Sequence, residues 1–228
     1  MIMDGNRRWA AAQKKEVEMD HDAAEPGNTL EALLASVNTC LRHGIPYLSV
    51  YALSIENLQR KDDSVTLIHS MLKLKCSEII STLCERGARL QFSGDRDLFD
   101  ASVDSAVAAI EHGTSACTKM LVTVLFCYGA QQEIVAAARS VARQVAAGTL
   151  ALADITAEAF EKELWTGNLP PVDLLVRTGG FRRLSNFLLY KVAYTELAFL
   201  DILWPQLTVE ILEGLLSEFY KTERKFGR

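Results

Sequence analysis

Short apolar runs alternate with longer helical stretches along most of this chain. Five runs have the apolar, partly β-branched composition of buried strands: residues 47–53, 89–92, 120–126, 172–176 and 197–203. Helical spacing or a glycine stop marks the stretches between them: residues 29–43, 65–86, 100–119, 131–147 and 209–225. This alternation predicts βαβ units, and therefore an α/β fold with a mostly parallel sheet flanked by helices.

The length of 228 residues fits a single domain, residues 1–228, and we see no linker or repeat. Only three residues precede the first polar motif, which is compatible with further residues upstream. The polar stretch of residues 14–28 has no apolar periodicity, so we expect a mobile loop there.

The amino-acid composition argues against several classes of function. A formal net charge of −5 argues against a general nucleic-acid binder, which usually carries a basic excess. No apolar run reaches the ~18 residues of a membrane span. The five cysteines show no CxxC spacing and lie in apolar contexts, so we expect reduced, buried thiols in a cytoplasmic protein: Cys40, Cys76, Cys84, Cys117 and Cys127. The four histidines show no ligand spacing.

Polar residues gather on the loops that follow the predicted strands. Ligands of parallel sheets bind outside the carboxyl ends of the strands. The loops expected at that edge are residues 4–8, 54–60, 128–132 and 177–185. Their charged and glycine-bearing sequences predict one active site for a phosphorylated substrate and a metal.

Asp4 begins the first of these loops and precedes Gly5. A carboxylate at this point can hold magnesium against a diphosphate, and Gly5 lets backbone N–H groups approach it. The alternative is an N-cap of the first helix, a common use of aspartate before a helix. Both roles are compatible with the sequence.

Arginines surround a double glycine in the last loop. Arg177, Arg182 and Arg183 flank Gly179 and Gly180. Guanidinium groups match phosphate oxygens bidentately, and the hydroxyl of nearby Ser185 can complete such a site. The alternative, a solvated basic turn, is less favoured in an acidic chain.

Two further segments have a structural and a functional interpretation. Ser54, Glu56, Asn57 and Arg60 lie on a polar loop that either binds a phosphate or only connects two elements. Glu196 stands inside an apolar stretch, where a buried carboxylate needs either an arginine partner or a metal. The apolar stretch of residues 65–83 is either plain core or the wall of a hydrophobic tunnel.

The chain resembles the cis-prenyltransferases, the family of undecaprenyl diphosphate synthase, from Met3 to Gly227. Four segments carry the resemblance: MDGNRRWA (residues 3–10), SIENLQR (54–60), DLLVRTGGFRRLSNFLLY (173–190) with the AYTEL and LWP that follow it, and ERKFG (223–227). The family fold implies a homodimer whose protomer has a central, mostly parallel six-stranded sheet and a hydrophobic tunnel.

The resemblance also implies a reaction. Family members join an allylic diphosphate to a five-carbon prenyl diphosphate, with Mg²⁺ assisting departure of diphosphate. By resemblance, Asp4 holds magnesium and diphosphate, and Asn57 lies near the transferred proton. Glu196 matches a magnesium-site carboxylate that can come from the neighbouring subunit. The remaining residues match substrate-binding positions: Gly5, Asn6, Arg7, Arg8, Trp9, Ser54, Glu56, Arg60, Arg177, Arg183 and Ser185.

The chain departs from the family pattern near both phosphate loops. Leu58 replaces the usual Trp, residues 127–131 replace Asn-Tyr-Gly-Gly-Arg, and Phe181 replaces a Glu. These changes leave two hypotheses open: a short-chain head-to-tail synthase, or irregular head-to-middle condensation with dimethylallyl diphosphate as acceptor. A third, less favoured because Asp4 is retained, is a non-catalytic partner subunit. Contact with a membrane surface is expected only if the product is long.

Overall fold

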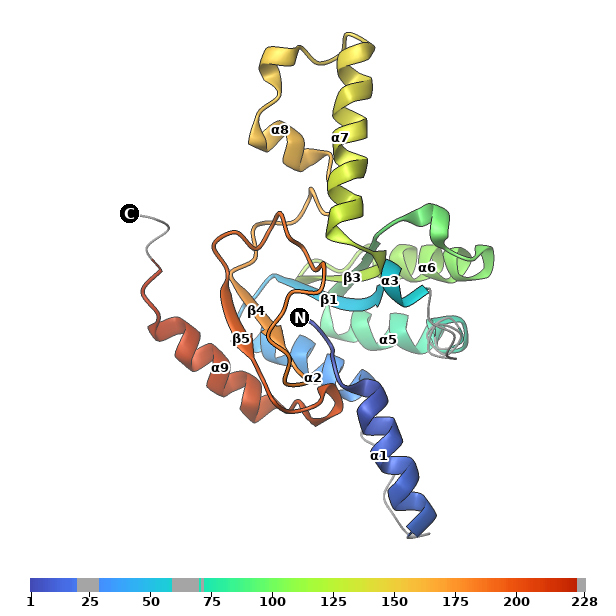
Figure 1. Cartoon of the computed structure of the whole chain (residues 1–228). Coiled ribbons are helices and arrows are strands. Elements are labelled where there is room, and N and C mark those ends of the chain that lie inside the picture. Colours follow the sequence, from blue (N-terminus) through green and yellow to red (C-terminus); the bar gives the residue numbers. More distant parts are fainter. Residues whose placement is uncertain (20–28, 59–69, 71, 225–228) are drawn as a thin grey trace.

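The computed structural model describes residues 1–19, 29–58, 70 and 72–224, and their arrangement is shown in Figure 1. From residue 13 to residue 19 the description covers the backbone alone. The main elements, in chain order, are α1 (Asn6–Met19), α2 (Thr29–Arg42), β1 (Tyr47–Ser54), α3 (Ile55–Leu58), α5 (Cys76–Arg86), β2 (Ala88–Ser93), α6 (Ala101–Gly113), β3 (Met120–Tyr128), α7 (Ala130–Ala146), α8 (Ala157–Lys162), β4 (Leu174–Arg177), β5 (Glu196–Phe199) and α9 (Val209–Lys221).

The strands form two parallel groups. In the first, β3 lies between β1 and β2, and in the second, β4 pairs with β5. Ile2 joins the groups, because it makes a parallel bridge to Tyr51 of β1 and another to Arg177 of β4. Its backbone N–H donates to the carbonyl of Val176 at 2.9 Å. The segment that leads into Asp4 therefore runs between β1 and β4.

The predicted α/β architecture with a parallel sheet is confirmed, but the count of six strands is not. The described residues form five strands, and the bridging segment contributes one paired residue, Ile2, which is too short for a strand. Strand β3 lies between β1 and β2, and eight of its nine residues are buried. This explains its almost wholly apolar sequence.

Most predicted elements match within a few residues, but the helix predicted over residues 100–119 ends at Gly113 and α8 was not predicted. A third difference concerns α1. The stretch expected to be a loop, residues 14–28, is helical up to Met19, where α1 ends. Lys, Glu and Met are good helix formers even without an apolar face, which explains why a polar sequence continues the helix. Residues 20–28 lie outside the described part of the chain. Of the helix predicted over residues 65–86, the described second half contains α5.

The prediction of buried thiols is only partly correct. Cys127 is buried at the end of β3, whereas Cys84 is exposed near the end of α5. The Sγ atoms of Cys84 and Cys117 lie 3.4 Å apart. The apolar sequence around Cys84 therefore did not indicate correctly whether this residue is buried. Among the described residues, no helix combines the length and apolar character needed to cross a membrane.

The parallel strands bring three polar loops to one edge. Strand β1 ends at Ser54, β4 ends at Arg177, and the bridging residue Ile2 is followed two positions later by Asp4. Helix α7 begins directly after β3 at the same edge, and Figure 1 shows it projecting away from the sheet together with α8. The functional residues predicted from sequence lie largely around this edge.

Candidate active site

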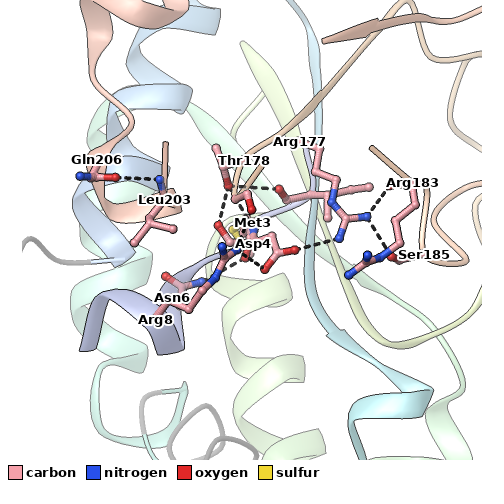
Figure 2. A network of polar contacts seen from close by, with 12 residues as sticks. Met3, Asp4, Asn6, Arg8, Arg177, Thr178, Arg183, Ser185, Leu203 and Gln206 are labelled. Carbon is pink, nitrogen blue, oxygen red and sulfur yellow. Dashed lines mark hydrogen bonds and ion pairs between the residues drawn. The ribbon is translucent and has the colours of Figure 1, made fainter. Parts of the chain in front are cut away.

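The backbone of Asp4 is fixed by a threonine from the other end of the chain. The N–H of Asp4 donates to Oγ1 of Thr178 at 3.1 Å, and the same hydroxyl donates to the Asp4 carbonyl at 2.8 Å. The carbonyl also accepts from the N–H of Trp204 at 3.0 Å. Figure 2 shows Thr178 above Asp4 and Arg177 beside it. Asp4 is therefore held by the segments that follow β4 and β5.

The Asp4 carboxylate faces arginines. Arg177 Nη2 donates to Asp4 Oδ2 at 2.8 Å, and Arg8 Nη2 lies 3.5 Å from Asp4 Oδ1. The Arg177 side chain is 3% exposed, so this is a nearly buried cation beside a carboxylate that is 27% exposed. A simple N-cap role does not describe Asp4, because its carboxylate oxygens are directed to the two guanidinium groups.

Arg177 also organises the loop that follows it. Its Nη1 donates to Ser185 Oγ at 2.8 Å and to the carbonyl of Arg183. Ser185 and Asn186 both have positive φ angles, 51° and 63°, which non-glycine residues rarely adopt. Such strain persists only where surrounding contacts enforce it. A buried arginine that clamps a strained turn is not the solvated basic turn that the sequence left open.

Gly179 is required at the closest approach of the two loops. Its φ is +91°, and a Cβ built on it would lie 2.6 Å from Arg8 Nη2 and 3.0 Å from the Cβ of Asp4. The Gly179 carbonyl accepts a hydrogen bond from Arg8 Nη2 at 2.8 Å. The absence of a side chain at this position lets Arg8 reach both Asp4 and the backbone of the second loop.

The segment after β1, expected to be a loop, forms the short helix α3, and Asn186 joins this helix to the same site. Its Nδ2 donates to Glu56 Oε1 at 2.9 Å, and its Oδ1 accepts from the N–H of Gln131 in the first turn of α7 at 2.9 Å. Partial burial alone would raise the pKa of Glu56. Hydrogen bonds from Asn186, the backbone and Ser54 outweigh it and leave this pKa below its usual value. The Asn57 N–H donates to Ser54 Oγ at 3.2 Å.

These loops surround a cavity of about 870 Å³. Its lining consists of Ile2, Met3, Asp4, Gly5, Asn6, Arg7, Arg8, Ala11, Tyr51, Ala52, Leu53, Ser54, Glu56, Asn57, Arg177, Phe181, Arg183, Ser185 and Asn186. Nearly all predicted site residues that the structure describes are therefore brought together. Arg60 lies outside the described part of the chain.

Three described residues that the sequence singled out do not line the cavity: Trp9, Arg182, which is exposed, and Glu196. Trp9 follows Arg8 on α1, where successive side chains point in different directions. Glu196 begins β5 opposite Leu174, three residues before Phe199 is paired with Arg177. It therefore lies toward the opposite end of these strands from Asp4. The described residues hold no group of three or more His, Cys, Asp or Glu side chains suited to a metal.

Four residues in or beside the cavity escaped the sequence analysis as site residues. Thr178 binds the backbone of Asp4, and Asn186 joins Glu56 to the start of α7. Tyr51 donates from its hydroxyl to the carbonyl of Tyr128 at 3.0 Å, and Phe181 contacts two arginines. Thr178 and Asn186 adjoin Arg177 and Ser185 in the sequence. Their position inside the motif was the signal that could have identified them as site residues. Nothing in the sequence alone pointed to the contacts of Phe181.

Comparison with known proteins agrees with this geometry. Residues 2–227 match the family described as "Putative undecaprenyl diphosphate synthase". The chain belongs to the cis-prenyltransferase family. It is 37% identical over 228 residues to the ditrans,polycis-undecaprenyl-diphosphate synthase ((2E,6E)-farnesyl-diphosphate specific) of Pseudomonas aeruginosa, covering 100% of this chain and 89% of that protein. An isoprenyl transferase of Geobacter sulfurreducens is also 37% identical, over 100% of this chain and 91% of that protein.

A solved structure extends the comparison. The crystal structure of lavandulyl diphosphate synthase from Lavandula x intermedia in complex with dimethylallyl diphosphate superposes with a TM-score of 0.89 and 27% sequence identity. The superposition covers 100% of this chain and 96% of that chain. This cis-prenyltransferase is thus an enzyme of isoprenoid biosynthesis, and the cavity around Asp4 is its candidate active site.

Proposed function

We propose that this cis-prenyltransferase transfers the prenyl group of an allylic diphosphate to a second five-carbon prenyl diphosphate and releases diphosphate. One observation carries the proposal: Arg177 is nearly buried and contacts both Asp4 and Ser185 in a cavity that Arg8 and Arg183 also line. Three arginines and a hydroxyl around one carboxylate suit polyanionic diphosphate groups.

The chemistry requires an electrostatic site more than an acid or a base. When the allylic C–O bond breaks, the diphosphate leaves with the bonding electron pair and the prenyl group becomes cationic. The double bond of the acceptor then supplies the electrons of the new C–C bond, and a proton is lost from the acceptor. Arg8, Arg177 and Arg183 would stabilise the charge on the departing diphosphate. Asn57, which lines the same cavity, would orient the acceptor near the proton that is lost.

Asp4 fits a magnesium ligand in this scheme. Mg²⁺ in phosphate sites is usually bound through one or two carboxylates together with substrate phosphates, so a site with one carboxylate is sufficient. Asp4 Oδ2 pairs with Arg177, and its Oδ1 lies at 3.5 Å from Arg8. Bound there, the ion would neutralise charge on the diphosphate. Gly5, Asn6 and Arg7 would complete the allylic phosphate loop.

Glu196 would act only across a subunit interface. Its place at the start of β5 keeps it from the cavity of its own chain. Strand β5 is paired only with β4 among the described residues, and Leu197 beside Glu196 is 49% exposed. Apolar side chains on a sheet edge are commonly covered by a partner. We therefore propose a homodimer that brings Glu196 toward the neighbouring subunit.

The favoured product is a short prenyl diphosphate made with isopentenyl diphosphate as acceptor. The apolar part of the described lining consists of Ile2, Met3, Ala11, Tyr51, Ala52, Leu53 and Phe181. The curated relatives, in contrast, are named for the undecaprenyl product. The product of this enzyme must therefore be measured.

Irregular condensation is the second candidate. Its support is the lavandulyl diphosphate synthase structure with dimethylallyl diphosphate, which matches the whole chain. A second support is Phe181, an uncharged residue that lines the cavity beside Arg8 and Arg183. In this reaction dimethylallyl diphosphate would serve as both donor and acceptor, and the product would be branched.

Product analysis distinguishes the two candidates. Purified protein with Mg²⁺ would receive dimethylallyl, geranyl or farnesyl diphosphate, each with and without isopentenyl diphosphate, and products would be identified by mass spectrometry and NMR. A linear cis product that requires isopentenyl diphosphate supports the first proposal. A branched product from dimethylallyl diphosphate alone supports the second. No product under any condition would overturn both and favour a partner subunit.

A further inference from the structure

Phe181 lies between the two phosphate loops and contacts an arginine from each. The Cζ of Arg8, on α1, lies 5.1 Å from the centre of the Phe181 ring, and the Cζ of Arg183 lies 4.2 Å from it. The face of an aromatic ring attracts a guanidinium group at these distances. Phe181 is 42% exposed and lines the cavity with both arginines.

The backbone before Phe181 is rigidly placed. Gly179 and Gly180 have φ angles of +91° and +76°, and their N–H groups donate to the carbonyls of Ile202 and Leu200 at 2.7 and 2.8 Å. These two bonds tie the loop to the segment after β5. The fixed backbone therefore holds the ring in place, and the ring can hold the two arginines that it contacts.

Arg183 differs from Arg177 and Arg8, which line the same cavity. Arg177 and Arg8 both contact the Asp4 carboxylate. Within the described residues, no carboxylate lies within ion-pair distance of the Arg183 guanidinium, and its recorded contact is the Phe181 ring. A carboxylate would hold this cation by neutralising it. An aromatic ring holds it through the π face and leaves the in-plane N–H donors for a ligand.

We propose that Phe181 is a positioning residue for diphosphate binding, which orders Arg8 and Arg183 at the cavity without neutralising either charge. This inference rests on the proposed function, because a diphosphate group is the ligand that the two arginines would take. Donors that are already ordered reduce the cost of ordering side chains when the anion binds. Phe181 thereby contributes to affinity for the substrate without itself reacting.

Inorganic pyrophosphate is the direct probe. Isothermal titration calorimetry with Mg²⁺ present would compare the wild-type chain with Phe181→Leu, which keeps an apolar side chain but has no ring face. We expect Phe181→Leu to bind pyrophosphate about three- to tenfold more weakly, equivalent to about 0.7–1.4 kcal/mol. Phe181→Trp restores a ring face and should return affinity to within about twofold of wild type.

A matched control replaces an exposed aromatic residue away from this cavity. Tyr220 on α9 is 59% exposed and stacks on His43, so Tyr220→Leu should leave pyrophosphate affinity unchanged. Steady-state kinetics add a readout that a merely structural role would not move. Phe181→Leu should raise KM for the prenyl diphosphates more than it lowers kcat, because ordering the arginines acts on substrate binding.

The outcomes separate this inference from the function on which it rests. If the wild-type chain binds pyrophosphate and Phe181→Leu binds it equally well, the role of Phe181 is overturned and the proposed function stands. If Phe181→Trp is as weak as Phe181→Leu, an aromatic face is not what matters, and the inference is again overturned. If the wild-type chain binds no pyrophosphate, the proposed function is overturned together with the inference.

Discussion

Arg177 Nη2 donates to Asp4 Oδ2 at 2.8 Å, although 173 positions separate the two residues in the chain. The pair forms because the bridging residue Ile2 aligns the first segment with the end of β4. Arg177 is almost completely enclosed, whereas Asp4 retains access to the cavity. The contact therefore fixes the orientation of a carboxylate that can still reach a ligand.

Replacement of Asp4 should separate catalysis from folding. We expect Asp4→Asn to reduce turnover on the order of 10²–10³-fold, since it removes the charge that would hold the metal while an amide oxygen can still accept from Arg177. Asp4→Ala should in addition reduce the free energy of unfolding by about 1–3 kcal/mol, because it leaves a buried donor of Arg177 without its partner. Radiolabelled product formation and chemical denaturation measure the two effects.

The same variants test the partner-subunit hypothesis. A non-catalytic subunit would lose no turnover on replacement of Asp4, and its support of an active homologue would be intact. Retention of wild-type turnover by Asp4→Asn would contradict a catalytic role for this carboxylate. Ser185→Ala is a useful comparison, because it removes one contact of Arg177 but leaves its pair with Asp4 in place.

Gly179→Ala should damage both stability and activity. The new Cβ would lie 2.6 Å from Arg8 Nη2, so the arginine must move away from Asp4 and from the carbonyl of residue 179. The positive φ adds about 1–2 kcal/mol of backbone strain. Pyrophosphate affinity and thermal unfolding report the two consequences.

Gly148 provides the matched control. It also has a positive φ, +71°, but a Cβ there would meet no atom within 4 Å. Gly148→Ala should therefore show the strain alone, with a lower Tm and unchanged pyrophosphate affinity. Equal affinities for Gly179→Ala and Gly148→Ala would show that the approach of Arg8 to the second loop does not matter for binding.

Sequence reasoning anticipated which segments converge where the topology of a parallel sheet decides their position. Asp4, Ser54 and Arg177 follow paired segments, so their convergence could be expected before the structure was known. Trp9 and Glu196 could not be placed in this way. Their side-chain directions depend on helix phase and strand register, which a motif does not specify.

Other features depend on contacts between distant residues. The hydrogen bonds of Asn186 to Glu56 and to the first turn of α7 join segments that are not adjacent in the sequence. The continuation of α1 to Met19 was missed because the sequence was judged by apolar periodicity, while helix propensity favours it. Local patterns predicted the elements well and the contacts between loops poorly.

Acid should weaken the contact between Glu56 and Asn186. The pKa of Glu56 is lowered in the folded state, so its stabilising contribution is present above the unfolded value near 4.5 and is lost as the pH falls through the folded value. The Glu56→Gln variant has no carboxyl group at this position, so its stability lacks this dependence on pH. Because the carboxylate is exposed to water, we expect the Tm advantage of wild type over the variant at pH 6–7 to be at most about 2 °C.

Thermal unfolding from pH 7 to pH 3 measures that advantage. It should shrink progressively as the pH falls through 4.5, the unfolded value, toward the lower folded value. A difference that is constant across this range would show that the charge of Glu56 does not support the contact with Asn186.

Thiol labelling should distinguish the end of β3 from the surface of α5. Burial, and secondarily the charge of Asp95, raise the pKa of Cys127 to about 12, so its thiol stays protonated and enclosed at pH 8. Cys84 is exposed. Because the thiolate is the nucleophile, iodoacetamide at pH 8 should label Cys84 in the folded protein and Cys127 only after unfolding.

Peptide mass spectrometry identifies the labelled residues, and Cys84→Ser supplies the control. Labelling of Cys127 at the rate of Cys84 would mean that the end of β3, directly before α7 and the Asn186 contacts, opens readily in the folded enzyme.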